Sequence, residues 1–293
     1  MYEDAPVARP DRWSARSAAG PDLMKALQGR LSVALIATPR QTLHTCRIDE
    51  QLADVIARNQ VGFDYFPVTD SAPQGQERIV GLIELVPFLR GNSVCGIVRD
   101  HLLPLSEDNV IGADAGILTF VRTADRHRCR LVISGSQVSG LVSLSDLQQL
   151  PVRAALFALI TQLEMTMADA IRRESGSTDR WKDRLSDSRK ENIDRQRKDA
   201  VADDNLIDDL LFTQFCDKIT IVRKSPAFEV SKSQFDAEMA QAQKLRDNLA
   251  HANDYAATRD AAAKVCAIVR NVEEWMKHLN GWLSDGSVKG EAT

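Results

Sequence analysis

The stretch Gly140-Leu141-Val142-Ser143-Leu144-Ser145-Asp146 decides the fold, because it joins the end of one element to the start of another. The residues from Val138 to Val142 predict a strand, and Ser145-Asp146-Leu147 begins a helix. A comparable stretch, Gly81-Leu82-Ile83-Glu84-Leu85-Val86-Pro87, lies about sixty residues earlier, and repeats of this kind usually stack to bury a shared face. The sequence therefore predicts two copies of one unit.

Short β-like runs alternate with short helical stretches around both segments. A helix opens at Asp49 with strands at 66–70 and 79–83, and a second helix opens at Asp114 with strands at 130–133 and 138–142. This alternation predicts an α/β module over residues 22–150, with repeats at 22–91 and 92–150.

The pattern of Gly140, Ser143 and Asp146 resembles the Gly-x-x-Ser/Thr-x-x-Asp signature of CBS domains, named after cystathionine β-synthase. The resemblance covers roughly residues 24–150 and implies a tandem CBS pair that binds a regulatory nucleotide: AMP, ADP, ATP or S-adenosylmethionine. It also implies that the Ser143 hydroxyl lies near phosphate or ribose and that the Asp146 carboxylate binds the ribose hydroxyls. All three residues are therefore candidate nucleotide ligands.

Two features of this module leave alternatives open. In the first repeat Glu84 and Pro87 replace the hydroxyl and the carboxylate, so no standard site is expected there. In the second, Ser-x-x-Asp before an apolar helix is equally typical of a capping box. A basic run could meet ligand phosphates, although a solvated loop is favoured; it comprises Arg122, Arg126, His127, Arg128 and Arg130.

From residue 151 onward β signals nearly vanish. Apolar residues recur at helical spacing in 154–172, in 233–249 and in 258–283, and 206–222 reads as a core helix of which 219–222 alone could be a strand. These segments predict a helical bundle over 151–284, between a leader at 1–21 and a tail at 285–293. The charged stretch 172–198 is interpreted as a solvated face, with RNA contact as the alternative.

Within the predicted bundle, Arg246 and His251 are five residues apart on one helix. The spacing alone is weak, since Arg122 and His127 share it. Helical geometry distinguishes the pairs, because Arg246 projects into an apolar stripe while Asp247 and His251 lie on another face, where the carboxylate can orient the imidazole. About 140° separates Arg246 from His251, so a site shared by two chains is expected.

The sequence Leu245-Arg246-Asp247-Asn248-Leu249-Ala250-His251 resembles the Arg-x4-6-His motif of HEPN domains. The resemblance implies a homodimeric, metal-independent endoribonuclease that cuts single-stranded RNA, in which Arg246 and His251 are catalytic and Asp247 supports them. Glu164 and Asn248 take supporting positions. Arginine would stabilise phosphoryl charge and histidine would transfer protons, since RNA supplies its own 2′-hydroxyl nucleophile. In the alternative interpretation, Arg246 pairs with Glu164 to lock a silent bundle.

Composition limits the remaining classes. The chain has 293 residues, a formal net charge of −4 and five cysteines without a Cys-x-x-Cys pair, so neither a disulfide framework nor a zinc site is indicated. No apolar run is long enough to predict a membrane span, and a cytoplasmic location is expected. The fold class is α+β multidomain: a tandem CBS-like module followed by an all-α HEPN-like bundle.

The expected function is a nucleotide-regulated endoribonuclease, which resembles the RNA-cutting effectors of toxin or antiviral defence systems. The alternative is a non-catalytic module that senses a nucleotide and binds a partner or RNA.

Overall fold

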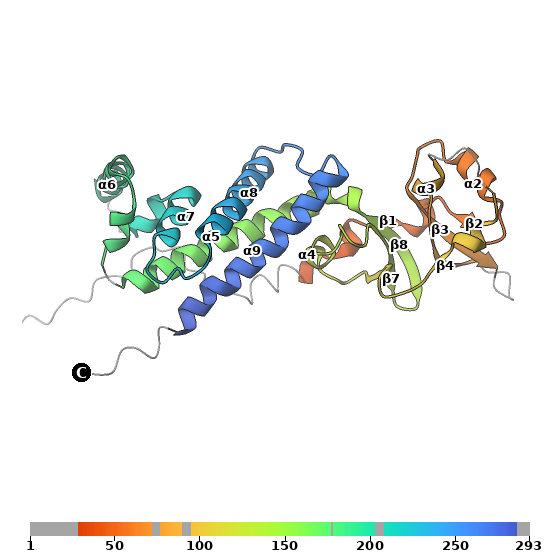
Figure 1. The fold of residues 1–293 in the computed structure, drawn as a ribbon, viewed down its shortest axis with the longest axis horizontal. Coiled ribbons are helices and arrows are strands. Elements are labelled where there is room, and N and C mark those ends of the chain that lie inside the picture. The colour runs from red at the N-terminus through yellow and green to blue at the C-terminus, as the bar shows by residue number, and fades with distance from the viewer. Residues whose placement is uncertain (1–28, 72–76, 90–94, 177, 203–207, 286–293) are drawn as a thin grey trace, which may run out of the picture. The chain divides into compact units, whose positions relative to one another are not determined.

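The computed structural model describes residues 29–71, 77–89, 95–176, 178–202 and 208–285 (Figure 1). These residues form two compact units, one containing 29–157 with Asn248–Val269 and the other Ala158–Asp247 with 270–285. The predicted leader at 1–21 and all but the first residue of the predicted tail lie outside the described residues. Each unit is considered by itself below.

Two four-stranded sheets make up the α/β module, and each follows the same plan. In each sheet a parallel pair, β2·β3 or β6·β7, is extended by an antiparallel hairpin, β3·β4 or β7·β8. The first sheet has the order β2-β3-β4-β5, with β2 at Cys46–Arg47, β3 at Tyr65–Ser71, β4 at Glu77–Glu84 and β5 at Leu103–Pro104. The second has the order β1-β8-β7-β6, with β1 at Thr38–Pro39, β6 at Val110–Gly112, β7 at Cys129–Ser134 and β8 at Gln137–Ser143.

Short helices complete the two repeats. The first repeat contains 3-10 helices η1 (Val33–Leu35) and η2 (Arg40–Thr42) with helices α2 (Leu52–Arg58) and α3 (Val86–Leu89); the second contains η3 (Val98–His101), α4 (Ile117–Val121) and η4 (Leu144–Gln148). The predicted α/β module built from two similar halves is therefore confirmed.

The two repeats exchange their leading strands. Strand β1 is the first strand of the first repeat but pairs with β8 of the second, and β5 is the first strand of the second repeat but pairs with β4 of the first. At each crossing the facing residue is a glycine, because a Cβ on Gly81 would overlap the Leu103 carbonyl and one on Gly140 would lie 2.5 Å from the Thr38 carbonyl oxygen. The exchange requires residues without a side chain at these two positions.

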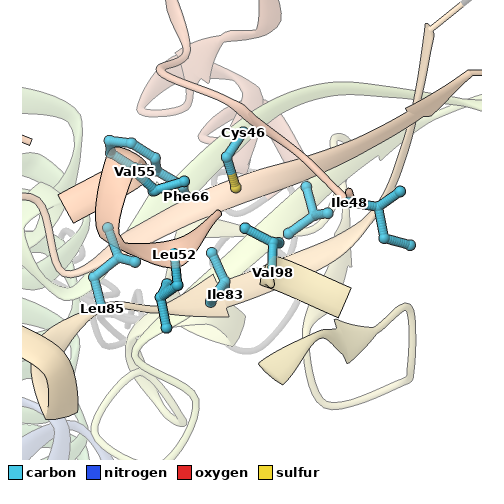
Figure 2. Close-up of a cluster of buried hydrophobic side chains, with 9 residues drawn as sticks. Cys46, Ile48, Leu52, Val55, Phe66, Ile83, Leu85 and Val98 are labelled. Atoms are coloured by element: carbon cyan, nitrogen blue, oxygen red, sulfur yellow. The ribbon is translucent and has the colours of Figure 1, made fainter. Parts of the chain in front are cut away.

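Buried apolar side chains hold the module together. Helix α2 packs against the first sheet through a cluster, shown in Figure 2, that also includes Val98 of η3 from the second repeat: Cys46, Ile48, Leu52, Val55, Phe66, Val68, Ile83, Leu85 and Val98. A second cluster joins the two sheets, since Ile79 and Leu82 of β4 pack with Cys129 and Leu131 of β7 and Val138 of β8. This is the shared face that the repeat predicts.

The rest of the described chain is helical. It contains α5 (Leu150–Ser175), η5 (Arg180–Arg184), α6 (Asp187–Ala202), η6 (Asp209–Phe212), α7 (Phe215–Arg223), α8 (Lys232–Ala250) and α9 (Arg259–Asp285). The alternative of a strand at 219–222 is wrong, because these residues lie inside α7. Helix α5 ends before Gly176, whose positive φ of 58° stops the helix.

Apolar periodicity gives these helices their core. The rings of Phe235 and Trp275 meet edge to face with centroids 4.9 Å apart, and Phe228 contacts Phe235 at the same distance. Among the described residues, one helix, α5, is long and apolar enough to cross a membrane, and 56% of its most apolar window is buried inside the protein. The core helix of a soluble protein meets the same criterion.

Candidate functional site

A cavity of about 260 Å³ lies within the first unit, at the edge of the α/β module. Four segments line it: the approach to β3, the start of β7, the end of β8 with the turn after it, and the first turn of α9. Its walls are mainly apolar, and its polar groups come from Asp64, Tyr65, Arg128, Ser143, Ser145, Thr258 and Arg259. Mostly apolar walls with a few convergent polar groups are typical of small-molecule sites.

Of the three predicted nucleotide ligands, only Ser143 lines this cavity. Its hydroxyl lies 2.7 Å from that of Ser145, also on the cavity wall. Asp146 instead accepts the Ser143 backbone N–H at 2.6 Å and the Gln149 side-chain amide at 2.7 Å. Burial raises the pKa of the Asp146 carboxyl above its usual value. The capping alternative therefore describes Asp146 in this structure, while Ser143 both precedes the helix and faces the cavity.

Gly140 has a structural reason to be glycine. It faces Pro39 across the β1·β8 pairing, where the Thr38 carbonyl leaves no space for a side chain. It does not line the cavity.

The basic run predicted as a solvated loop is divided by the start of β7. Arg130 is buried within the strand, and burial lowers the pKa of its guanidinium. Arg126 is exposed, and Nδ1 of the half-buried His127 lies 3.8 Å from Asp108. Arg128 is also exposed, but it lines the cavity, and no described carboxylate lies within ion-pair distance of it. Arg128 is thus a cation beside Ser143 in the lining of the cavity.

The start of α9 provides the second cation. Thr258 precedes the helix and its hydroxyl accepts the Ala261 backbone N–H at 3.1 Å. The next residue, Arg259, donates to the Asp64 carboxylate at 2.5 Å, and this hydrogen bond raises the pKa of Arg259. Burial and the nearby Glu84 carboxylate raise the pKa of Tyr65, so its phenol stays neutral. The charged groups on the cavity wall are therefore two arginines and one aspartate.

An arginine that the sequence did not single out fixes the turn between α8 and α9. Arg153, in the first turn of α5, donates to the backbone oxygens of Asn248 and Leu249 at 3.1 Å and of Asn253 at 2.9 Å. Its guanidinium lies 5.0 Å from the ring of Tyr255, whose hydroxyl donates to the Leu147 carbonyl. These bonds satisfy the carbonyls at the end of α8 and tie the turn to the module.

The predicted catalytic pair is arranged differently from the expectation. Arg246 is half-buried rather than enclosed by apolar side chains, because its side chain is 39% exposed. Its nitrogens lie 3.9 Å from the Glu164 carboxylate and 3.8 Å from that of Asp247, longer than hydrogen bonds. Its guanidinium lies 5.9 Å from the Phe215 ring centroid. Glu164 is held instead by the buried Lys218, which donates to it at 3.0 Å.

His251 does not continue the helix that carries Arg246. Helix α8 ends at Ala250, and His251 lies in an exposed turn before Ala252, whose φ of 54° is left-handed. The expectation that both residues lie on one helix is therefore wrong. Asn248, predicted to support catalysis, is half-buried, and its backbone oxygen accepts from Arg153 and from the Asn253 N–H at 2.9 Å.

Comparison with solved structures finds CBS domains. No protein-family model matches the chain, and no curated protein matches it. The CBS domain of a bacterial CNNM/CorC family Mg²⁺ transporter, solved with ATP, shares 18% identity over 44% of this chain and 92% of its own, with a TM-score of 0.35. CBSX2 of Arabidopsis thaliana, solved with AMP, shares 19% over 43% of this chain and 96% of its own, with a TM-score of 0.34.

A hemolysin-like protein containing a CBS domain from Oenococcus oeni shares 15% identity over 42% of this chain and 94% of its own, with a TM-score of 0.33. None of these comparisons shows a HEPN domain, so the HEPN-like interpretation of the helical part stays a prediction.

Proposed function

We propose that the α/β module binds an adenine mononucleotide in the cavity and that the helical part reports its presence to a partner. The observation that carries the proposal is the placement of Ser143, from the CBS-like pattern, and the cation Arg128 on the wall of one cavity. A hydroxyl and a guanidinium are a suitable pair for a phosphate, because arginine offers several donors in a planar fork.

The size of the cavity favours AMP over larger ligands. Small-molecule sites usually enclose roughly 300–1,000 Å³, and this one encloses about 260 Å³. The smallest of the expected nucleotides needs the least widening. ATP and S-adenosylmethionine are bulkier and would require a larger movement of the walls.

The position of α9 supports a sensing role. Arg259 and Ala262 of α9 contribute part of the cavity wall, and this helix continues to Asp285 in the second unit. A ligand that touches α9 acts directly on an element shared by both units. Such a ligand shifts the equilibrium between two conformations of the protein only to the extent that it binds one of them more tightly. This difference in affinity is typically about 5–150-fold.

Calorimetric titration of AMP into the purified protein tests the proposal. Ser143→Ala and Arg128→Gln should each weaken binding about 10-fold or more, as expected for a lost hydrogen bond to a charged group. Arg126→Gln is the matched control, because this neighbouring arginine is exposed and does not line the cavity. Absence of AMP binding, or equal losses in all three variants, would refute the site.

Ribonuclease activity is a second candidate, resting on the HEPN resemblance and on one observation. Because Arg246 is 39% exposed and its ion pairs are 3.8–3.9 Å long, its guanidinium is free to meet a phosphate. Asp247 and His251 are also exposed. In this candidate function, single-stranded RNA reaches Arg246, and the histidine that completes the site belongs to a second copy of the chain.

A cleavage assay in EDTA tests this candidate. Wild-type protein should cut single-stranded RNA to leave a 2′,3′-cyclic phosphate, and both Arg246→Ala and His251→Ala should abolish cutting. Lys244→Ala, an exposed change two residues before Arg246, is the control that should retain activity. Equal RNA decay in all four proteins would leave non-catalytic sensing as the function.

A further inference from the structure

The ion pair between Arg259 and Asp64 connects two walls of the cavity. Arg259 is the first residue of α9 and Asp64 directly precedes β3, so the pair joins the helix to the first repeat. A guanidinium nitrogen of Arg259 lies 2.5 Å from a carboxylate oxygen of Asp64, and both residues line the cavity. The pair belongs to the candidate site. It is also a contact between the first repeat and the helical hairpin, which consists of the end of α8, the turn at 251–258 and α9.

This pair is weak enough to be exchanged. Both side chains are nearly half exposed, at 46% and 44%. Solvent screens such pairs, which typically change an equilibrium constant by no more than about fivefold. A guanidinium bonded to a phosphate inside a cavity is favoured more strongly, since charge-assisted hydrogen bonds gain strength as water is excluded.

The neighbouring anchors define which part of the hairpin can move. Arg153 holds the carbonyls of Asn248, Leu249 and Asn253, and Tyr255 bonds to Leu147, and none of these bonds involves a cavity residue. Between Tyr255 and Arg259 the hairpin has no such anchor among the bonds described. Among the described bonds, the Arg259–Asp64 pair is therefore what ties the first turn of α9 to the first repeat.

We propose that Arg259 is a ligand-exchanged latch: it pairs with Asp64 in the free protein and transfers to the phosphate of the bound nucleotide. This inference rests on the proposed function, because it requires AMP in the cavity. The exchange releases the start of α9 from the first repeat and widens a cavity that is small for a nucleotide. Asp64 is thus a competitor of the ligand, and Arg259 is a binding residue that also carries the signal.

A double-mutant cycle on AMP affinity tests the latch. Asp64→Asn removes the competitor and should tighten AMP binding about two- to fivefold, while Arg259→Gln should weaken it about tenfold. Adenosine, which lacks the phosphate, should bind the Asp64→Asn and Arg259→Gln proteins equally, because it makes no bond to Arg259. In the Arg259→Gln background, Asp64→Asn should no longer tighten binding, because its effect passes through Arg259.

The matched control is Asp49→Asn, which removes an exposed Arg47–Asp49 pair of similar geometry that does not line the cavity. It should leave AMP affinity unchanged. Additive effects of Asp64→Asn and Arg259→Gln on AMP affinity would overturn the latch. The tighter binding of Asp64→Asn would then come from removing a negative charge near the phosphate, and the proposed AMP site would stand. Failure of the wild type to bind AMP would overturn the proposed function, and the latch with it.

Discussion

Substitution of Gly140 by alanine separates a structural role from a ligand-binding role. The new Cβ would lie 2.5 Å from the Thr38 carbonyl oxygen, whereas ordinary van der Waals contact begins at 3.4 Å. The obstacle is backbone rather than a flexible side chain, so β1 must move away from β8 at the pairs Thr38↔Leu141 and Pro39↔Gly140. Forced contacts of this kind typically cost about 1–3 kcal/mol.

A smaller gain opposes this cost, because alanine has less conformational freedom than glycine in the unfolded chain, worth about 0.5–1 kcal/mol. The net prediction for Gly140→Ala is a loss of about 1–2 kcal/mol in the free energy of unfolding. Urea denaturation followed by circular dichroism measures this change, and calorimetry measures AMP affinity under native conditions. Affinity should stay within about twofold of the wild type, since Gly140 does not line the cavity.

The opposite outcome would refute the reasoning. If Gly140→Ala is as stable as the wild type but binds AMP ten times more weakly, the glycine serves the nucleotide and not the strand crossing. Gly81→Ala provides the matched test, since it creates the same obstacle at the equivalent crossing, against Leu103. It should destabilise the protein at least as much.

Three further predictions concern the helical hairpin and the turn after β8. Arg153→Gln should destabilise the protein by about 2–4 kcal/mol, because it removes charged donors from three carbonyls. Amide hydrogen exchange at residues 248–255 should accelerate, and unchanged exchange would show that other contacts hold the turn. Burial raises the Asp146 pKa, so its folded state favours the protonated acid. The free energy of unfolding of the wild type, relative to that of Asp146→Asn, should therefore be greatest below pH 3.8, the ordinary pKa of an aspartate, and should fall as the pH rises through the raised pKa. Urea titrations at several pH values measure this difference, and a rise with pH would contradict the raised pKa. Gly281→Ala in α9 meets no atom within 4 Å and should stabilise the protein by about 0.5–1 kcal/mol in the same assay, and a loss would reveal a contact at that position.

Local patterns were sufficient to predict the repeated α/β module and the helical part. The β-rich runs, the helix starts and the two glycine-led stretches are each contained within a few residues, so strand and helix types followed from periodicity. The Ser-x-x-Asp pattern allowed both capping and ligand contact. Only the three-dimensional structure separated these roles, because it shows that the Asp146 carboxylate accepts the Ser143 backbone N–H while Ser143 lines the cavity.

The cavity itself could not be predicted, because its walls come from segments far apart in the chain. Residues near Phe63, Arg128 and Arg259 meet only after the strand exchange and the return of the hairpin. The same holds for Arg153, whose carbonyl partners are 95–100 residues away. His251 was wrongly placed on this helix for a local reason: a glycine often marks the end of a helix, and here Ala252 adopts the left-handed conformation instead.

A crystal structure of the protein with AMP tests the central claim most directly. The account predicts one AMP per chain in the cavity, with its phosphate within hydrogen-bond distance of Arg128 and near the Ser143 hydroxyl, and with Arg259 turned from Asp64 toward the phosphate. AMP bound at another surface, or a saturated crystal whose cavity holds no nucleotide, would contradict it.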